Sequence, residues 1–132
     1  MPTFTIRTTA RSQLLDITSQ VQAAVRAIGA ADGVATVFCP HTTAAITINE
    51  NADPDVQRDW LRTLDELVPA NQPHFRHAEG NSDSHLKSSL VGASEQVIVS
   101  GGKLVLGTWQ AIYFAEFDGP RTRTVHVAMV KG

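Results

Sequence analysis

The spacing of apolar residues at the start of the chain predicts a strand followed by a helix. Over residues 3–9, apolar and β-branched side chains alternate with polar ones, as they do in a strand with one buried face. From Asp16 onward, apolar residues instead recur three or four positions apart up to Ile28, which is typical of an amphipathic helix. Gly29 stands where a left-handed turn ends such a helix.

The next segments are short apolar runs separated by residues that interrupt regular structure. Residues 34–39 form an apolar run that ends at a proline, and residues 43–49 form a second run of strand-forming residues. Asp53 and Pro54 then supply a cap and a first helical residue, and apolar residues continue at helical spacing up to Pro69. We therefore expect two strands followed by a helix.

The rest of the chain reads as a loop, a short helix and a set of strands. Residues 71–83 are polar and too many for an ordinary connection, and Ser82 or Asp83 can then cap a short helix that ends near Gly92. Gly-Gly and Asp-Gly-Pro turns separate four expected strands, at residues 95–100, 104–106, 109–117 and 122–130.

This order of elements predicts the α+β class. We expect a compact single domain over residues 1–132, built as a mostly antiparallel or mixed β-sheet sandwich with two main helices and a short third helix.

Composition narrows the range of functions. The 132 residues are 42% hydrophobic, which is enough for a buried core, and the single cysteine excludes a disulfide framework. Eleven Lys and Arg against thirteen Asp and Glu give a net charge of −2, whereas a general nucleic-acid binder carries a basic excess. No apolar run is long enough to span a membrane and the first residues do not resemble a signal peptide, so we expect a cytoplasmic protein with neither nucleic acid nor membrane as partner.

The most informative polar cluster lies where the long loop meets the short helix. It holds His77, Glu79, Asn81, His85 and Lys87 within eleven residues. A helix N-terminus exposes free N–H groups and the positive end of the helix dipole, and a lysine in the first turn is unfavourable unless an anion accompanies it. The cluster therefore indicates a phosphate or carboxylate site, unless Lys87 simply points to solvent.

Three histidines are candidate metal ligands. His41, His77 and His85 could form the three-histidine set that suits Zn-like ions, with Glu79 as general base or as the group that orients a ligand histidine. The gap between His77 and His85 is not a tight metal-binding spacing, so ordinary hydrogen-bonding histidines are the competing interpretation.

Three strings of residues give the sequence a strong resemblance to the YjbQ family, which is described as secondary thiamine-phosphate synthase. They run from His41 to Asp53, from His77 to Leu90, and from Leu104 to Gln110 followed by Glu116 to Arg121. The resemblance implies a homotrimer with polar pockets where subunits meet. It also implies a weak activity that couples a pyrimidine diphosphate to a thiazole phosphate with release of pyrophosphate.

The residues and the resemblance together give our predicted site. Release of pyrophosphate leaves a carbocation-like methylene, so the reaction needs stabilisation of an anion more than a strong nucleophile. The predicted catalytic residues are Glu79, Lys87, Gln110 and Arg121; the substrate-binding residues are Thr42, Thr43, Asn51, Asn81, Lys87 and Arg121; and the metal ligands are His41, His77 and His85. We expect the substrate to be a small phosphorylated or anionic molecule, the resident cation to be Zn-like, and Mg²⁺ to arrive with substrate phosphates.

Two other functions remain open at this point. The chain has no Gly-x-Ser-x-Gly elbow, phosphate-loop motif or dinucleotide fingerprint, so a non-catalytic trimer that binds a metal or metabolite is one alternative. The second is a metal-dependent hydrolase of a phosphoester, because Glu79 and three histidines would suit an activated water.

Overall fold

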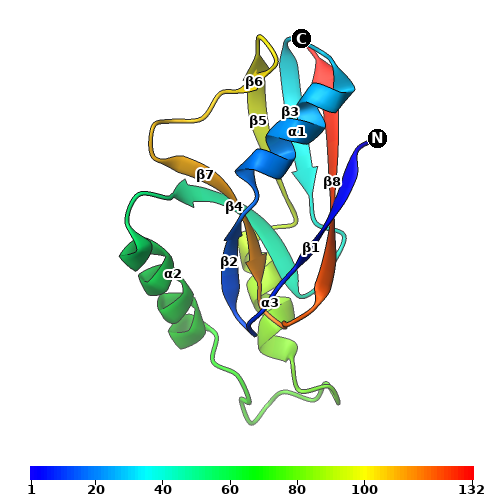
Figure 1. Cartoon of the computed structure of the whole chain (residues 1–132). Helices are drawn as coiled ribbons and strands as arrows, with labels where there is room; N and C mark the ends of the chain where they lie inside the picture. The colour runs from blue at the N-terminus through cyan, green and yellow to red at the C-terminus, as the bar shows by residue number, and fades with distance from the viewer.

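The computed structural model describes all residues from 1 to 132 and contains three helices and eight strands (Figure 1). In chain order the elements are β1 (Thr3–Arg7), β2 (Gln13–Asp16), α1 (Thr18–Ile28), β3 (Gly33–Phe38), β4 (Ala44–Glu50), α2 (Pro54–Leu67), α3 (Ser82–Val91), β5 (Ser94–Ser100), β6 (Lys103–Leu104), β7 (Gln110–Glu116) and β8 (Thr122–Lys131). The predicted α+β class is confirmed.

The strands form two sheets in which every pairing is antiparallel. The larger sheet has the order β1-β8-β3-β5-β6, and the smaller one has the order β2-β7-β4. Inward-facing residues of β3, β5 and β8 meet those of β4 and β7 and one side of α1 in a single apolar cluster. Burial of this cluster supplies most of the hydrophobic stabilisation.

The first helix forms where its spacing predicts, and it ends as predicted. Val21, Ala24 and Val25 are its buried residues, and they lie on the stripe that a 3.6-residue period defines. Gly29 has φ 79° and its N–H donates to the carbonyl of Val25. A residue with a Cβ would be strained in this left-handed conformation, so glycine is favoured here.

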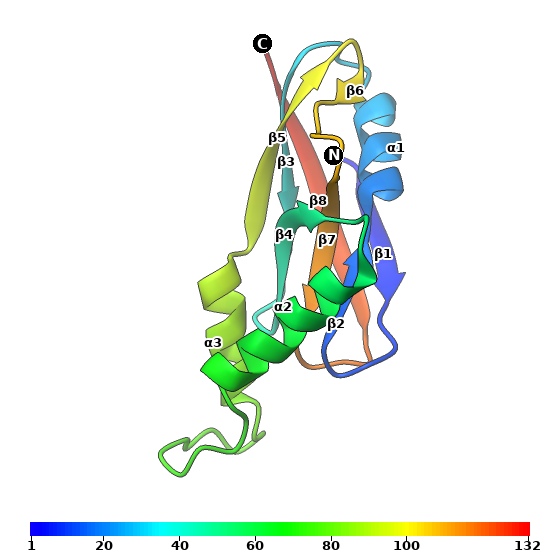
Figure 2. The same cartoon turned by 90° about the vertical axis from the view of Figure 1, so that its left-hand side faces the viewer.

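The second helix begins as its sequence predicts, but none of its residues is buried. The Asp53 side chain accepts a hydrogen bond from the Asp55 N–H, as an N-cap residue does. No residue of α2 is buried, although Trp60 stacks on Phe117 with ring centroids 6.3 Å apart. Leu67 remains 72% exposed. Figure 2 shows α2 and α3 projecting from the lower half of the molecule, with the loop between them extending further still.

Two local differences from the sequence prediction concern short segments. Strand β2 was not predicted, because its four residues are too few to display a periodicity; it pairs with β7, with Leu15 opposite Phe114. The N-cap of α3 is Asn81, which precedes the predicted Ser82 by one residue and the predicted Asp83 by two, and its side chain makes no capping hydrogen bond. Helix α3 then ends at Gly92, as predicted.

The topology brings three polar connections together. The β3–β4 connection, the β7–β8 turn and the N-terminus of α3 lie at the same end of the two sheets (Figure 1). Two hydrogen bonds attach α3 there: Ser84 donates to the Phe117 carbonyl at 2.6 Å, and Ser88 donates to the Ala44 carbonyl at 2.7 Å.

Candidate functional site

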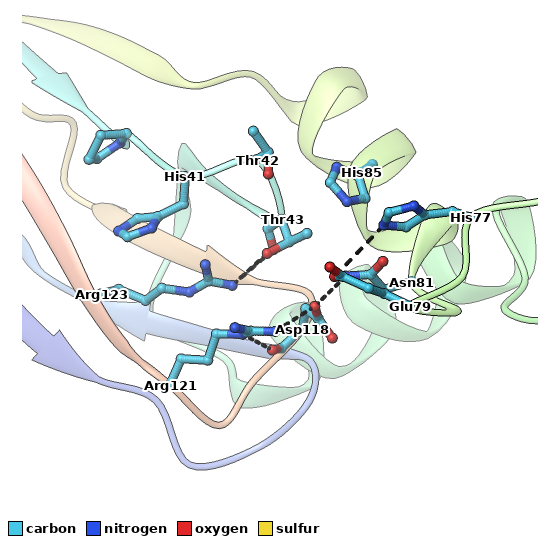
Figure 3. A pocket seen from close by; sticks show the side chains of 11 residues that line it. His41, Thr42, Thr43, His77, Glu79, Asn81, His85, Asp118, Arg121 and Arg123 are labelled. Carbon is cyan, nitrogen blue, oxygen red and sulfur yellow. Dashed lines mark hydrogen bonds and ion pairs between the residues drawn. The ribbon is translucent and has the colours of Figure 1, made fainter.

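A pocket of about 400 Å³ opens at this end of the molecule, and none of its lining residues is hydrophobic. We call it the polar pocket. The β3–β4 connection, the loop before α3, α3 itself and the β7–β8 region supply its lining (Figure 3), which consists of Pro40, His41, Thr42, Thr43, His77, Glu79, Asn81, His85, Asp118, Arg121 and Arg123. Eight of the eleven residues that the sequence predicts for the site therefore share one pocket.

His41 is fixed by a hydrogen bond to the main chain. Strand β3 pairs with β8 as far as Phe38 opposite His126, and Pro40 then ends the pairing. The N–H of Thr124, the next main-chain donor on that side of β8, donates instead to His41 Nε2 at 2.9 Å. Burial and the nearby positive charge of Arg123 lower the pKa of His41, which favours the neutral ring.

A buried ion pair supports the floor of the polar pocket. Glu116 is completely buried and accepts hydrogen bonds from Arg123 Nε at 2.8 Å, from Arg123 Nη2, and from Thr8 Oγ1 at 2.8 Å. Burial alone raises the pKa of Glu116, but the hydrogen bonds from Arg123 and Thr8 outweigh it, so its pKa lies below the ordinary value. Arg123 Nη2 also donates to Thr43 Oγ1 at 2.8 Å, which fixes that hydroxyl.

A second arginine is held beside the first by the β7–β8 turn. Arg121 Nε donates to the Asp118 carbonyl at 2.8 Å, and Arg121 Nη2 donates to Asp118 Oδ2 at 3.0 Å. The same carboxylate oxygen accepts from Asn81 Nδ2 at 2.6 Å. Asn81 is 6% exposed and its Oδ1 has no hydrogen-bond partner.

His77 and His85 face each other on the opposite side of the polar pocket (Figure 3). Their ring centroids are 5.4 Å apart and the rings are nearly perpendicular, at 86°. Glu79 Oε2 lies 3.7 Å from His77 Nε2, close enough to orient the ring but too far for a direct hydrogen bond.

The residues do not assemble the predicted three-histidine metal site within this chain. No group of three or more His, Cys, Asp or Glu side chains is arranged to hold a metal ion. The Nε2 lone pair of His41 is already used by Thr124, and His41 lies across the pocket from the other two histidines.

Lys87 does not line the polar pocket. Its side chain is only 1% exposed, so it does not point to solvent either, and its ammonium group pairs with Asp65 and, at 3.3 Å, with Asp83. Arg11 donates to the same Asp83 carboxylate at 3.0 Å. The hydrogen bonds from Arg11 and Lys87 outweigh burial and hold the pKa of Asp83 below its ordinary value.

Asn51 and Gln110 lie at the far end of the smaller sheet. Glu50 pairs with Gln110 at one end of the β4–β7 ladder and Ala44 pairs with Glu116 at the other, so the two ends are about 20 Å apart. The Asn51 amide donates to Asp16 at 2.8 Å, and Gln110 Oε1 accepts from the Gly107 N–H at 2.8 Å. Neither residue reaches the polar pocket of its own chain.

Sequence reasoning missed Arg123 and did not select Asp118. The signal for Arg123 was present, because it lies on the same face of its strand as the buried Val125 and Val127. A charged residue at a buried strand position requires a partner, which is a recognisable sign of a special role.

Comparison with known proteins identifies the family. The family model described as "UPF0047 protein YjbQ-like" matches residues 2–132. This chain belongs to the YjbQ (UPF0047) family. The UPF0047 protein YugU of Bacillus subtilis is 55% identical over 130 residues, which are 98% of each chain, and a UPF0047 protein of Methanocaldococcus jannaschii is 51% identical over 127 residues, covering 96% of this chain and 91% of that protein.

Solved structures of relatives share the fold. An uncharacterised YjbQ/UPF0047 protein from Clostridium acetobutylicum superposes with a TM-score of 0.94 at 54% identity and covers 98% of this chain and 100% of that one. A conserved hypothetical protein from Thermus thermophilus gives a TM-score of 0.91 at 41% identity, over 98% of this chain and 100% of that one. The family resemblance in the sequence is thus confirmed. None of the three helices is both long and apolar enough to cross a membrane.

Proposed function

We propose that the polar pocket is the active site of a small-molecule enzyme whose substrate carries a phosphate or another oxyanion. The observation that supports this most directly is the lining: two arginines and three histidines surround about 400 Å³, and no hydrophobic residue contributes. Ligand sites of this size are usually mostly apolar, so a lining of polar and charged side chains with one proline favours a small, highly charged ligand.

For the reaction, we propose the coupling that the family resemblance implies. The bond between the pyrimidine methylene and the diphosphate oxygen breaks, the methylene forms a bond to the thiazole ring nitrogen, and pyrophosphate leaves with the bonding electrons. The site must then stabilise negative charge on the leaving group, which is a task for fixed N–H donors. Arg121 and Arg123 are the nearest cationic donors, and each is held by a carboxylate.

The direct test is product formation. Purified protein is given the pyrimidine diphosphate, the thiazole phosphate and Mg²⁺, and thiamine phosphate is measured by chromatography over many turnovers. Arg121→Met should lower the rate at least tenfold, whereas Arg58→Met, at an exposed arginine on α2, should not change it. Absence of product together with absence of pyrophosphate binding would exclude the proposal; binding without product would identify a binding protein.

A hydrolase is the second candidate, and the contact between Glu79 and His77 favours it. A carboxylate beside an imidazole can help deprotonate a water that attacks a phosphoester. A panel of small phosphoesters, assayed with and without a chelator, separates this reaction from coupling. Hydrolysis that Glu79→Gln abolishes, without any coupling activity, would establish it.

The predicted Zn-like ion and the homotrimer also remain proposals. Elemental analysis after equilibration with Zn²⁺ and dialysis tests the ion, and sedimentation equilibrium tests the trimer. In the trimer that the family resemblance implies, Asn51 and Gln110 would have to serve the pocket of a neighbouring subunit, because they do not reach their own.

A further inference from the structure

We propose that His41 acts as a neutral hydrogen-bond donor, through Nδ1–H, to an oxyanion of the ligand, and that it is not a ligand of a metal ion. This inference rests on the proposed function only in that it places an anionic ligand in the polar pocket. It gives His41 a different role from the one its sequence context suggests.

The main chain decides the tautomer of His41. A backbone N–H can only donate, so the Thr124 N–H that lies 2.9 Å from Nε2 requires a lone pair on that nitrogen. The proton of the neutral ring must then be on Nδ1. Protonation of both nitrogens would place two N–H groups against each other at Nε2.

The free nitrogen of His41 is therefore a donor on a residue that lines the polar pocket. Nδ1 makes no hydrogen bond within the protein, while Nε2 makes one to Thr124. A metal ion requires a nitrogen with a free lone pair, but the lone pair of Nε2 accepts from the Thr124 N–H and Nδ1 carries the proton. His77 and His85 lie across the pocket, so an ion held by them would not require His41 (Figure 3).

Two more donors border the same side of the polar pocket. Arg123 uses Nε and Nη2 for Glu116 and Thr43, and Arg121 uses Nε and Nη2 for Asp118. In each guanidinium the remaining Nη1 has no partner within the chain. These nitrogens and His41 Nδ1 form a group of N–H donors whose charges are already balanced by carboxylates.

Such a group recognises oxyanions by oriented hydrogen bonds. The ligand group that fits is a phosphoryl or diphosphate group with several oxygen acceptors, because each donor requires its own lone pair. When no ligand is bound, a neutral donor in the pocket costs less free energy than an unpaired cation would. His41 would therefore contribute to orienting the anion without adding net charge to the pocket.

NMR spectroscopy tests the assignment without any need for turnover. Long-range ¹H–¹⁵N spectra of the labelled protein, with the His41 signals identified by their loss in His41→Asn, should show a protonated Nδ1 and an unprotonated Nε2. Addition of pyrophosphate should shift the Nδ1 signal, and addition of Zn²⁺ should leave both nitrogens unchanged. An Nε2-protonated ring, or a Zn²⁺-induced shift of either His41 nitrogen, would overturn the proposal.

A pair of substitutions tests the donor itself. The amide nitrogen of asparagine lies where Nδ1 of histidine lies, so His41→Asn retains a donor that His41→Leu removes, while both lose the acceptor for Thr124. In calorimetric titrations with pyrophosphate, His41→Leu should bind at least tenfold more weakly than His41→Asn, as expected for one hydrogen bond to a charged group. Equal weakening in the two variants would contradict the donor role.

The outcomes for this inference and for the proposed function are distinguishable. Failure of the wild-type protein to bind pyrophosphate would overturn the proposed function together with the donor role of His41. Wild-type binding with a Zn²⁺-sensitive His41 would overturn the inference alone. His126→Asn serves as the matched control, because His126 contacts Thr3 on the larger sheet and does not line the polar pocket.

Discussion

Replacing Arg123 with Met removes the guanidinium from the ion pair beneath the polar pocket and leaves the Glu116 carboxylate without its cation. Glu116 is completely buried and accepts five hydrogen bonds, of which Arg123 donates two. The other three come from the Thr8 hydroxyl and from the N–H groups of Phe117 and Asp118. The carboxylate would thus keep part of its solvation and lose its counter-charge.

The expected loss of stability follows from these contacts. Removing one partner of a buried ion pair costs about 3–5 kcal/mol, and the three remaining hydrogen bonds place this case at the lower end, at about 3 kcal/mol. For a domain of this size the change corresponds to a fall of about 10 °C in the melting temperature. Glu116→Gln should cost a similar amount, because it leaves Arg123 buried without an anion.

A double-mutant cycle tests this pair: urea denaturation is measured for the wild type, both single variants and the double variant. It should be run at one fixed protein concentration, because association would otherwise contribute to the measured stability. The double variant should lose at least 1 kcal/mol less than the sum of the single losses, since groups in contact do not contribute additively. Strict additivity would refute the idea that Arg123 and Glu116 stabilise each other.

The pH dependence of stability gives an independent check on Glu116. Its pKa in the folded protein lies below the ordinary value, so its contribution is complete above about pH 4.3 and is lost as the pH falls through the folded pKa. In Arg123→Met, burial would raise the pKa, and the carboxyl group would become neutral at a higher pH. The stability gap between wild type and variant should therefore narrow from about pH 7 to about pH 4; a constant gap would refute the argument.

Three further substitutions test other parts of the fold. Lys87→Met should destabilise the protein by about 2–3 kcal/mol in urea denaturation, because it removes a cation from the buried Asp83; a loss below 0.5 kcal/mol would show that Arg11 suffices. Gly119→Ala should lower the melting temperature clearly, because a Cβ would lie 2.3 Å from the Ala10 carbonyl oxygen, and an unchanged melting temperature would contradict that packing. Asp53→Ala should cost about 1 kcal/mol through the lost helix cap, and an unchanged denaturation midpoint would contradict it.

Much of the fold could be predicted because its longer elements carry clear periodic patterns and explicit end signals. Helix α1 is amphipathic and ends at a glycine with positive φ, and α2 begins at a capping aspartate followed by proline. The strand β2 could not be predicted, because it depends on a long-range pairing with β7 and its four residues are too few to show a strand pattern. The exposure of α2 could not be predicted either, since an apolar stripe does not show how completely other elements cover a helix.

The sequence predicted most residues of the candidate site, but it did not show which of them point into one pocket. His85 and Lys87 lie only two residues apart on α3. A helix turns by about 100° per residue, so their side chains point in directions about 200° apart. His85 therefore lines the polar pocket, while Lys87 points to the buried acids. Asn51 and Gln110 illustrate the same problem along a strand, because β4 and β7 carry them to the end opposite His41.

Near the polar pocket, side chains at the ends of strands accept hydrogen bonds from main-chain N–H groups. Where β3 stops, His41 supplies the acceptor for Thr124, and where β7 stops, Glu116 accepts from the next two main-chain N–H groups. The hydroxyl of Thr8 likewise accepts from the Arg121 N–H at 2.8 Å. These hydrogen bonds fix the orientation of each side chain, and at His41 they leave Nδ1–H as the free group. The N–H donor that His41 offers to an anion would then be a consequence of how β3 ends.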